Sequence, residues 1–515
     1  MNKNYTSKAK WSVVLLTVAG MLFLCSSSQK TATKEKKITD YGIMFAVENG
    51  LLLEKGVFPN DVDVGTAKGI VTLSGSVDNL LAEDRAVKIA ESIRGVRGVI
   101  DMIAVSTVHR PDADIQKDIQ TALLQDPATA SYRVAVSVQG GVATLTGIVG
   151  SFMEKQLAGW IAKGVRGTRK IHNDITIIYR LNRTDREIAA DVKARLKWDV
   201  WINGELIDVA VKNGKVTLTG KVGSVINRSR AFDDAWVHGV KYVDESGIVI
   251  EPWVRDYTRR KSKNVTISDG DIKQAVQAAF SMDPRVSGFS PGITVEGGIV
   301  RLSGSVGNLK AKNSAEQDAK NIIGVWRVDN FLKVRPKQQI TDAEMKAQLT
   351  SALFRSPLLE GSTINAAVNN RVTDLSGMVV SSFQRGVAQD IASRTRGIVS
   401  VRNHLKVEPE VGTSYYNWPY SSHEWVAPFS VAIVYKDWPY ITDEQIKKNI
   451  EEGFLWSSHV DMDDVKVIVD EGEATLTGTV GTWVGWNEID NVAHTSGAIK
   501  VVNRVSIKNV VWLLE

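Results

Sequence analysis

Cysteine is nearly absent from this sequence, which has one copy, Cys25, among its 515 residues. A disulfide within the chain and a zinc site with four cysteine ligands are therefore both excluded. The seven histidines are scattered, and none belongs to an HExxH or H-x-H pattern. Because these side chains supply many metal ligands and catalytic groups, their scarcity argues against an enzyme built on a metal or an activated nucleophile.

A strong charge of one sign is also absent. The chain carries 63 lysines and arginines against 58 aspartates and glutamates, a net charge of +5. Proteins whose main partner is nucleic acid usually present a strong basic field, so this balance argues against such a partner. Apolar residues make up 43% of the chain and charged residues 23%, which is typical of globular protein. The length allows several domains of roughly 100–200 residues.

Residues 1–28 have the order of an export signal. Three lysines within the first ten residues precede a mostly apolar run of 14 residues that ends at Leu24, and small residues follow. This order is typical of a signal peptide, whereas a membrane-spanning helix needs about 20 apolar residues. Three interpretations stay open: lipid attachment at Cys25, although Leu24 replaces the small residue usual before a lipidated cysteine, ordinary cleavage near Ser28, or an uncleaved anchor. Each places the rest of the chain outside the cytoplasm.

The pattern Gly-x-Val-x-Leu-[Ser/Thr]-Gly-x-Val recurs along the chain in six copies. GIVTLSGSV at 69–77 and GIVRLSGSV at 298–306 are clear copies, and RVTDLSGMV at 371–379 is degraded. A further glycine follows the second glycine of each copy after 19 or 20 residues. Such constant spacing indicates six internal repeats of one structural unit. The second glycines of the motif are Gly75, Gly147, Gly220, Gly304, Gly377 and Gly478.

Hydrophobic periodicity divides each repeat into five elements. An amphipathic helix begins at a cap signal such as Thr184-Asp185, and an alternating strand and a tight turn such as Asn213-Gly214 follow. The motif forms the second strand, a second helix ends at the later glycine, and a third strand closes the unit. Because a strand–helix–strand connection favours a right-handed crossover between parallel strands, the order α-β-β-α-β predicts a three-stranded mixed sheet with two helices.

The predicted fold class is therefore α+β, as a tandem array of six such modules with two long junctions. Residues 252–266 are predicted to be a basic linker and residues 409–440 an aromatic-rich linker. The latter holds nine aromatic residues between 415 and 440, and it either packs on its neighbours as an ordered strap or binds partners, sugars or a bilayer. The modules are predicted at 38–109, 111–181, 183–251, 267–335, 337–408 and 441–509.

These repeats resemble the BON domain, a small bacterial module named for osmotically induced and nodulation proteins. The Val-x-Leu-x-Gly strand, the later glycine and the α-β-β-α-β order carry the resemblance, which covers residues 38–508. It implies a location in the bacterial periplasm or envelope, phospholipid as a candidate ligand, and neither catalytic residues nor a cofactor. We therefore expect the motif glycines to be structural, at points where the backbone packs closely against the second helix.

A cluster of cations marks the second repeat. Between residues 154 and 173 it has five cations against one acid, with Trp160 in the same helix. Basic residues beside an aromatic suit an anionic membrane surface. The alternative interpretation is a solvated helix face with Trp160 in the core. The five cations are Lys155, Lys163, Arg166, Arg169 and Lys170.

The sequence thus predicts a non-enzymatic exported protein of the envelope, either periplasmic or anchored on the outer side of the cytoplasmic membrane. Several weak modules in one chain would raise avidity for envelope components, phospholipid surfaces among them, under osmotic or envelope stress. The alternative is a protein-interaction or chaperone-like scaffold in the periplasm. The predicted partners are a membrane surface or other envelope proteins, not nucleic acid, and no cofactor is predicted.

Overall fold

The structure, a computed structural model, describes most of the chain beyond its N-terminal region. The described residues from Thr39 onward belong to one compact unit. The predicted signal with Cys25 and both predicted linkers, apart from Val254, lie outside the described residues. Within the described part, no helix combines the length and apolar character that a membrane span needs. The described residues are 38–53, 62–251, 254, 267–337, 339–407, 442–457, 460, 465–498 and 500–507.

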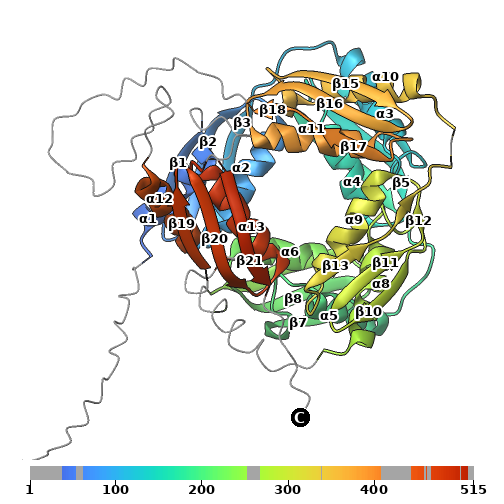
Figure 1. Cartoon of the computed structure of the whole chain (residues 1–515). Helices are drawn as coiled ribbons and strands as arrows, with labels where there is room; N and C mark the ends of the chain where they lie inside the picture. The colour runs from blue at the N-terminus through green and yellow to red at the C-terminus, as the bar shows by residue number, and fades with distance from the viewer. Residues whose placement is uncertain are drawn as a thin grey trace, which may run out of the picture. The chain divides into compact units, whose positions relative to one another are not determined.

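Six modules with the order helix, strand, strand, helix, strand follow one another along the chain (Figure 1). Module 1 comprises α1 (Asp40–Leu53), β1 (Val62–Ala67), β2 (Ile70–Val77), α2 (Leu80–Ser92) and β3 (Gly98–Val105). Module 2 comprises α3 (Asp112–Gln125), β4 (Arg133–Gln139), β5 (Val142–Val149), α4 (Phe152–Lys163) and β6 (Lys170–Ile177). Module 3 comprises α5 (Asp185–Trp198), the short η2 (Gly204–Leu206), β7 (Ile207–Lys212), β8 (Lys215–Val222), α6 (Val225–Ala235) and β9 (Tyr242–Ile250).

The second half of the chain repeats this order, with the later strands of modules 4 and 5 interrupted. Module 4 comprises α8 (Asp269–Met282), β10 (Gly292–Glu296), β11 (Ile299–Ser303), β12 (Ser305–Val306), α9 (Leu309–Lys320), β13 (Arg327–Asn330) and β14 (Lys333–Val334). Module 5 comprises α10 (Asp342–Arg355), η3 (Pro357–Leu359), β15 (Thr363–Asn369), β16 (Val372–Val379), α11 (Ser382–Arg394), β17 (Ser400–Asn403) and β18 (Lys406–Val407). Module 6 comprises α12 (Asp443–Trp456), β19 (Val465–Asp470), β20 (Glu473–Val480), α13 (Trp483–Thr495) and β21 (Lys500–Ile507).

The strands of each module form a mixed sheet. In module 2, β4 and β5 are antiparallel, with Val136 opposite Leu145, and β5 and β6 are parallel, with Leu145 opposite Asn173. The same pairing recurs in the other modules, and among the described strands no sheet extends from one module into another. The predicted fold class, six α+β modules in tandem, is confirmed.

The core of each module lies between its sheet and its helices. Strand residues alternate between buried and exposed, so that Ala143 and Leu145 of β5 are fully buried. The second helices turn small residues toward the sheet at four-residue spacing, as α9 does with Ala311, Ala315 and Ala319. A methyl group at these positions still contributes apolar area and lets the helix approach the sheet closely.

The second glycine of each motif has a backbone conformation that other residues rarely adopt. The φ angle is +140° at Gly147 and +129° at Gly220. A Cβ atom would clash with the carbonyl oxygen of Arg133 in the first case and with that of Leu206 in the second. The expectation that the motif glycines pack against the second helix is therefore wrong for Gly147, Gly220 and Gly377, whose close neighbour is the backbone at the start of the first hairpin strand.

An aspartate at the first position of each first helix clamps the hairpin turn. In module 2, the Asp112 carboxylate accepts hydrogen bonds from the N–H of Gly140, at 2.8 Å, and of Gly141, at 2.9 Å. The sequence pattern suggested a helix cap here, but in module 3 the preceding Thr184 provides that cap and frees the aspartate for the turn. The equivalent aspartates, each with two such bonds, are Asp40, Asp185, Asp269, Asp342 and Asp443.

Replacing Asp112 by alanine is expected to lower the thermal unfolding midpoint by a few degrees, because two backbone donors lose their acceptor. The same hydrogen bonds lower the pKa of Asp112. Its stabilisation is therefore present above the ordinary carboxyl pKa of about 4 and is lost as the pH falls through the lowered value. Calorimetry of the variant and the wild-type chain should show a difference that is constant between about pH 7 and about pH 5 and shrinks below about pH 4. Asp114→Ala, in the same first turn but outside the clamp, is the control, and an equal shift there would contradict the clamp.

Candidate functional site

Three pairs of modules, two of them distant in the sequence, contact each other through backbone hydrogen bonds. Each contact joins the end of a first helix to the end of a second helix, in the module pairs 3 and 4, 1 and 6, and 2 and 5. The modules are therefore docked on one another. The bonds run from the N–H of Val200 to the carbonyl of Asn321 at 3.0 Å, from Arg94 to Trp456 at 3.0 Å, and from Arg166 to Arg355 at 2.9 Å.

The residue that ends the first helix is a tryptophan in two of these contacts and an arginine in the third. Trp198 ends α5, and Trp456 ends α12. Trp198 packs against the core of module 4. In the contact between modules 2 and 5, Arg355 ends α10 at the same position. A cation thus replaces an indole at one of three equivalent contacts.

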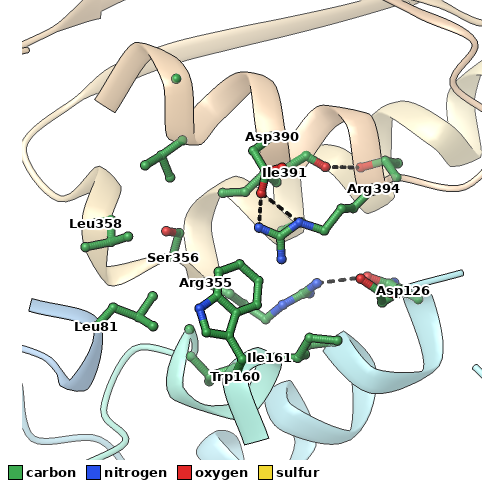
Figure 2. A pocket seen from close by; sticks show the side chains of 18 of the residues that line it. Leu81, Asp126, Trp160, Ile161, Arg355, Ser356, Leu358, Asp390, Ile391 and Arg394 are labelled. Carbon is green, nitrogen blue, oxygen red and sulfur yellow. Dashed lines mark hydrogen bonds and ion pairs between the residues drawn. The ribbon is translucent and has the colours of Figure 1, made fainter. Parts of the chain in front are cut away.

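A cavity of about 510 Å³ lies beside Arg355, where modules 1, 2 and 5 meet (Figure 2). Helices α2, α3, α4, α10 and α11 and the short η3 form its walls. The apolar part of the wall includes Leu81, Ile161, Leu358 and Ile391. Pockets for single small molecules usually measure roughly 300–1,000 Å³, so the cavity is large enough for one such molecule.

Arg355 has 5% of its surface exposed and is the only buried lysine or arginine among the residues that the structure describes. Its guanidinium donates to the hydroxyl of Ser351 at 2.6 Å and to the side-chain oxygen of Gln125 at 2.9 Å. Both acceptors are neutral, and no described carboxylate forms an ion pair with it. Burial lowers the pKa of Arg355, and only the charge of Asp118 opposes this effect.

Two carboxylates at the cavity wall are already neutralised by other cations. Asp84 lies 2.7 Å from the ammonium of Lys163. Asp390 pairs with Lys310, at 2.6 Å, and with Arg394. Burial alone would raise the pKa of Asp390, but the charges of Arg394 and Lys310 outweigh it and lower the pKa to about 2. Neither carboxylate is therefore left to compensate the buried arginine.

Two arginine side chains at the cavity form cation–π contacts with aromatic rings. The Arg394 guanidinium carbon lies 4.3 Å from the ring centroid of Trp160, and that of Arg85 lies 3.8 Å from the ring centroid of Phe383. Trp160 is 39% exposed and lines the cavity (Figure 2). The interpretation that places Trp160 in the core of its module is therefore wrong.

The five cations predicted to face an anionic surface do not share one environment. Lys163 is engaged in the ion pair with α2, and Arg166 lies at the contact with module 5, 3.9 Å from Glu360. Arg169 and Lys170 are exposed side by side at the start of β6. The structure thus separates two exposed cations from two that hold modules together. The fifth is Lys155, which is half-buried.

A second cluster of charges is buried where modules 3 and 4 meet. Asp199 accepts a hydrogen bond from Nε of Arg230 at 2.8 Å, and Asp234 accepts one from Nε of Arg195, also at 2.8 Å. Burial, followed by the charge of Asp234, raises the pKa of Asp199 to about 7. Burial likewise raises the pKa of Asp318, from module 4, well above its usual range. Because these groups face one another, we assign them to the docking of the two modules.

In several modules an asparagine of the third strand forms a hydrogen bond with the second helix of the same module. The side-chain amide of Asn173 donates to the carbonyl of Lys155 at 2.9 Å, and that of Asn330 donates to Lys312 at 3.0 Å. Like the aspartate clamp, this repeated residue stabilises its own module. Functional differences must therefore come from residues that do not repeat. The described part of the chain holds no group of three or more His, Cys, Asp or Glu side chains placed for a metal ion.

Arg355 and the cavity have no motif of their own in the sequence. Arg355 lies outside the repeated glycine pattern, and the cavity walls come from modules 1 and 2 and from the distant module 5. One signal was available: among the last residues of the six first helices, only Arg355 is charged, and the others are Leu53, Gln125, Trp198, Met282 and Trp456. Its exceptional charge is visible in that comparison, whereas its burial is not.

A family model described as "BON domain" matches six segments of the chain, which together make up well over half of it. The chain is 30% identical over 161 residues to Osmotically-inducible protein Y of Escherichia coli K12, which covers 29% of this chain and 80% of that protein. It is 29% identical over 149 residues to outer membrane lipoprotein DolP of Haemophilus influenzae, which covers 28% of this chain and 77% of that protein. The matched segments are 40–107, 111–179, 184–252, 268–336, 341–409 and 442–509.

Among solved structures, the C-terminal domain of CdsD, a structural protein of the type III secretion system of Chlamydia trachomatis, is 14% identical to the chain. The match covers 42% of this chain and all of that one, with a TM-score of 0.12. A score this low supports no structural inference.

Proposed function

The chain belongs to the BON domain family, and from that premise we propose that it is a non-enzymatic exported protein that binds components of the bacterial envelope. The names of two relatives, an osmotically inducible protein and an outer membrane lipoprotein, support an envelope location and a role in osmotic or envelope stress. The signal at 1–28, lipid attachment at Cys25, the module boundaries and the two linkers given above belong to this proposal.

The observation that carries the proposal is the presence of six copies of one module in one chain. The repeated polar residues, the clamp aspartates and the strand asparagines, are used within the modules. Binding would then depend on the residues that vary between modules. Several weak contacts on one chain raise the overall avidity because each later contact is intramolecular.

An anionic phospholipid surface is the binding partner that the charges favour. Arg169 and Lys170 lie exposed together in module 2, where they can approach a membrane without breaking an ion pair between modules. Each cation near an anionic surface contributes about 1 kcal/mol at best, so one pair binds weakly and several modules are needed. Lys155, which is half-buried, completes the proposed contact, whereas Lys163 and Arg166 of the predicted cluster are engaged in contacts between modules.

Reversing Arg169 and Lys170 to glutamate in the full mature chain is expected to reduce its binding to vesicles of anionic phospholipid several-fold. The reason is the loss of two attractive charges and the gain of two repulsive ones. Binding of the wild-type chain should also weaken with added salt, because screening reaches a Debye length of about 8 Å at physiological ionic strength. Vesicle sedimentation, with neutral vesicles in parallel, measures both effects.

The matched control is the double variant Lys212→Glu and Lys241→Glu in module 3. Both side chains are exposed, and the change in net charge is the same. Lys241 follows the later glycine of its module at the position that Arg169 has in module 2. If the two double variants lose the same amount of binding, the contact depends on net charge alone and the proposed patch is wrong.

A protein-binding scaffold is the second candidate, favoured by one exposed apolar patch. Ile100 and Met102 lie on β3, an edge strand of its sheet, and are 49% and 64% exposed. Exposed apolar side chains on an edge strand are typical of sites that pair with another chain. Capture of envelope proteins by the wild-type chain but not by Ile100→Lys, with vesicle binding unchanged, would favour the scaffold.

A further inference from the structure

The cavity between modules 1, 2 and 5 contains a buried positive charge that pairs with no described carboxylate, because Asp118, whose charge acts on it, is paired with Arg110 at 2.8 Å. The Arg355 guanidinium has two neutral acceptors, Ser351 and Gln125. A buried charge without a counter-charge destabilises a protein strongly, so such a group normally has an anion close by. The equivalent contacts of modules 3 and 6 use tryptophan at this position, so docking itself does not require a cation.

Cations outnumber carboxylates around this cavity. One of the three carboxylates, Asp126, has an oxygen that accepts the N–H of Ala128 at 2.9 Å, and the other two have their own cations. The lining cations are Arg85, Lys88, Arg355 and Arg394, and Lys163 and Lys310 pair with wall carboxylates. The carboxylates are Asp84, Asp126 and Asp390. The field in the cavity therefore favours an anion.

The remaining wall is apolar. Leu81 from module 1, Ile161 from module 2, and Leu358 and Ile391 from module 5 surround the space next to Arg355 (Figure 2). An inorganic anion would leave these side chains without a partner. A ligand that fits both parts has a charged head and an apolar body.

We propose that this cavity binds one amphiphilic anion, with its head group on Arg355 and a single hydrocarbon chain against the apolar wall. A guanidinium offers two parallel N–H donors, which match the oxygens of a carboxylate or of a phosphate. A free fatty acid and a single-chain alkyl phosphate share this chemistry. The site lies between modules and is independent of the exposed cations proposed to meet a membrane.

Calorimetric titration of the full mature chain with decanoate and decyl phosphate, each below its micellar concentration, and with decanol below its solubility limit tests the proposal. We expect saturable binding of one decanoate or decyl phosphate per chain and binding of decanol at least ten-fold weaker, because the neutral head cannot pair with the guanidinium. The stronger of the two anions identifies the head group. Equal affinity for decanol, or no saturable binding of either anion, would overturn the proposal.

Arg355→Met removes the charge and keeps an unbranched side chain at the contact. We expect its affinity for decanoate to fall at least ten-fold and its affinity for decanol to stay unchanged or rise. If the Arg355→Met variant binds neither decanoate nor decanol, the contact between modules 2 and 5 has rearranged. The next variant separates that outcome from a true absence of the site.

Gly386→Phe is expected to fill the cavity and to leave the fold intact. Gly386 lines the cavity within α11, and a Cβ atom there would meet no other atom within 4 Å. Replacing a helix-interior glycine also favours the helix, so the unfolding midpoint should stay equal or rise. We expect decanoate binding to be lost.

Gly98→Phe is the matched control. Gly98 also has open space around it but lies away from the cavity, so this variant should bind decanoate normally. Undiminished binding by Gly386→Phe would place the ligand elsewhere and overturn the proposal.

Discussion

A Gly220→Val variant of the full chain is expected to have a free energy of unfolding about 3–5 kcal/mol below that of the wild-type chain. The φ angle of +129° at Gly220 is one that a β-branched residue avoids, and its Cβ atom would clash with the carbonyl of Leu206. Relief of both strains requires β7 and β8 to move apart. Urea unfolding followed by circular dichroism measures the loss, and hydrogen exchange should locate it in module 3.

Gly65→Val is the matched control for this prediction. Gly65 also lies within a hairpin strand, but its φ angle is ordinary and a Cβ atom there meets nothing within 4 Å. Because valine favours strands, we expect the stability of this variant to stay the same or rise slightly. A similar loss in both variants would show that any side chain added to these hairpins is harmful, and would refute the specific role of Gly220.

Replacing Asp199 by alanine is expected to lower the free energy of unfolding by about 2–4 kcal/mol. Asp199 is buried and pairs with Arg230 at 2.7 Å, and its other oxygen accepts the N–H of Trp201 at 2.6 Å. Its removal takes a hydrogen-bond acceptor away from the Arg230 guanidinium and from the Trp201 N–H, and each such loss at a buried site costs about 1–3 kcal/mol. We reduce this value because a third of the Arg230 side chain still reaches water.

Asp199→Asn tests the charge separately from the hydrogen bond. Burial and the charge of Asp234 raise the pKa of Asp199 to about 7, so the folded chain holds this proton more tightly than the unfolded chain does. The stability from this group is therefore complete below about pH 4 and falls as the pH rises to about 7. Asparagine does not titrate, so the decrease in unfolding free energy between about pH 5 and about pH 8 should be smaller in this variant. Unchanged pH dependence would mean that Asp199 is ionised throughout this range. Asp233 and Asp234, which face the same arginine, stay in place in both chains.

The docking of modules limits which surfaces can bind a partner. The ends of the helices in each pair are used in contacts within the chain, as Arg166 and Arg355 are. Exposed strand starts such as that at Arg169 stay available. Functional differences between the modules should therefore be sought on the exposed strands and at the cavity.

The amino-acid sequence by itself determined the module and its number of copies. Helices, strands and turns depend on hydrophobic periodicity, caps and glycines within about 70 residues, and all of these are local signals. The Asn213-Gly214 turn is an example, since both residues have the positive φ angles that the dipeptide favours. The local pattern did not reveal the role of Gly147, because the carbonyl that requires a glycine there belongs to Arg133 on the paired strand.

Only the tertiary structure decided how the modules use their ends. Arg94 contacts Trp456 across most of the chain, and the cavity takes its walls from modules 1, 2 and 5. Such contacts depend on the fit between two folded surfaces, which has no period and leaves no motif in the sequence. The sequence placed Lys163 and Arg166 in one basic cluster, whereas the fold engaged both in contacts between modules, because their partners lie in modules 1 and 5. Arg355 became a site candidate for the same reason: its burial arises only when module 5 docks on module 2.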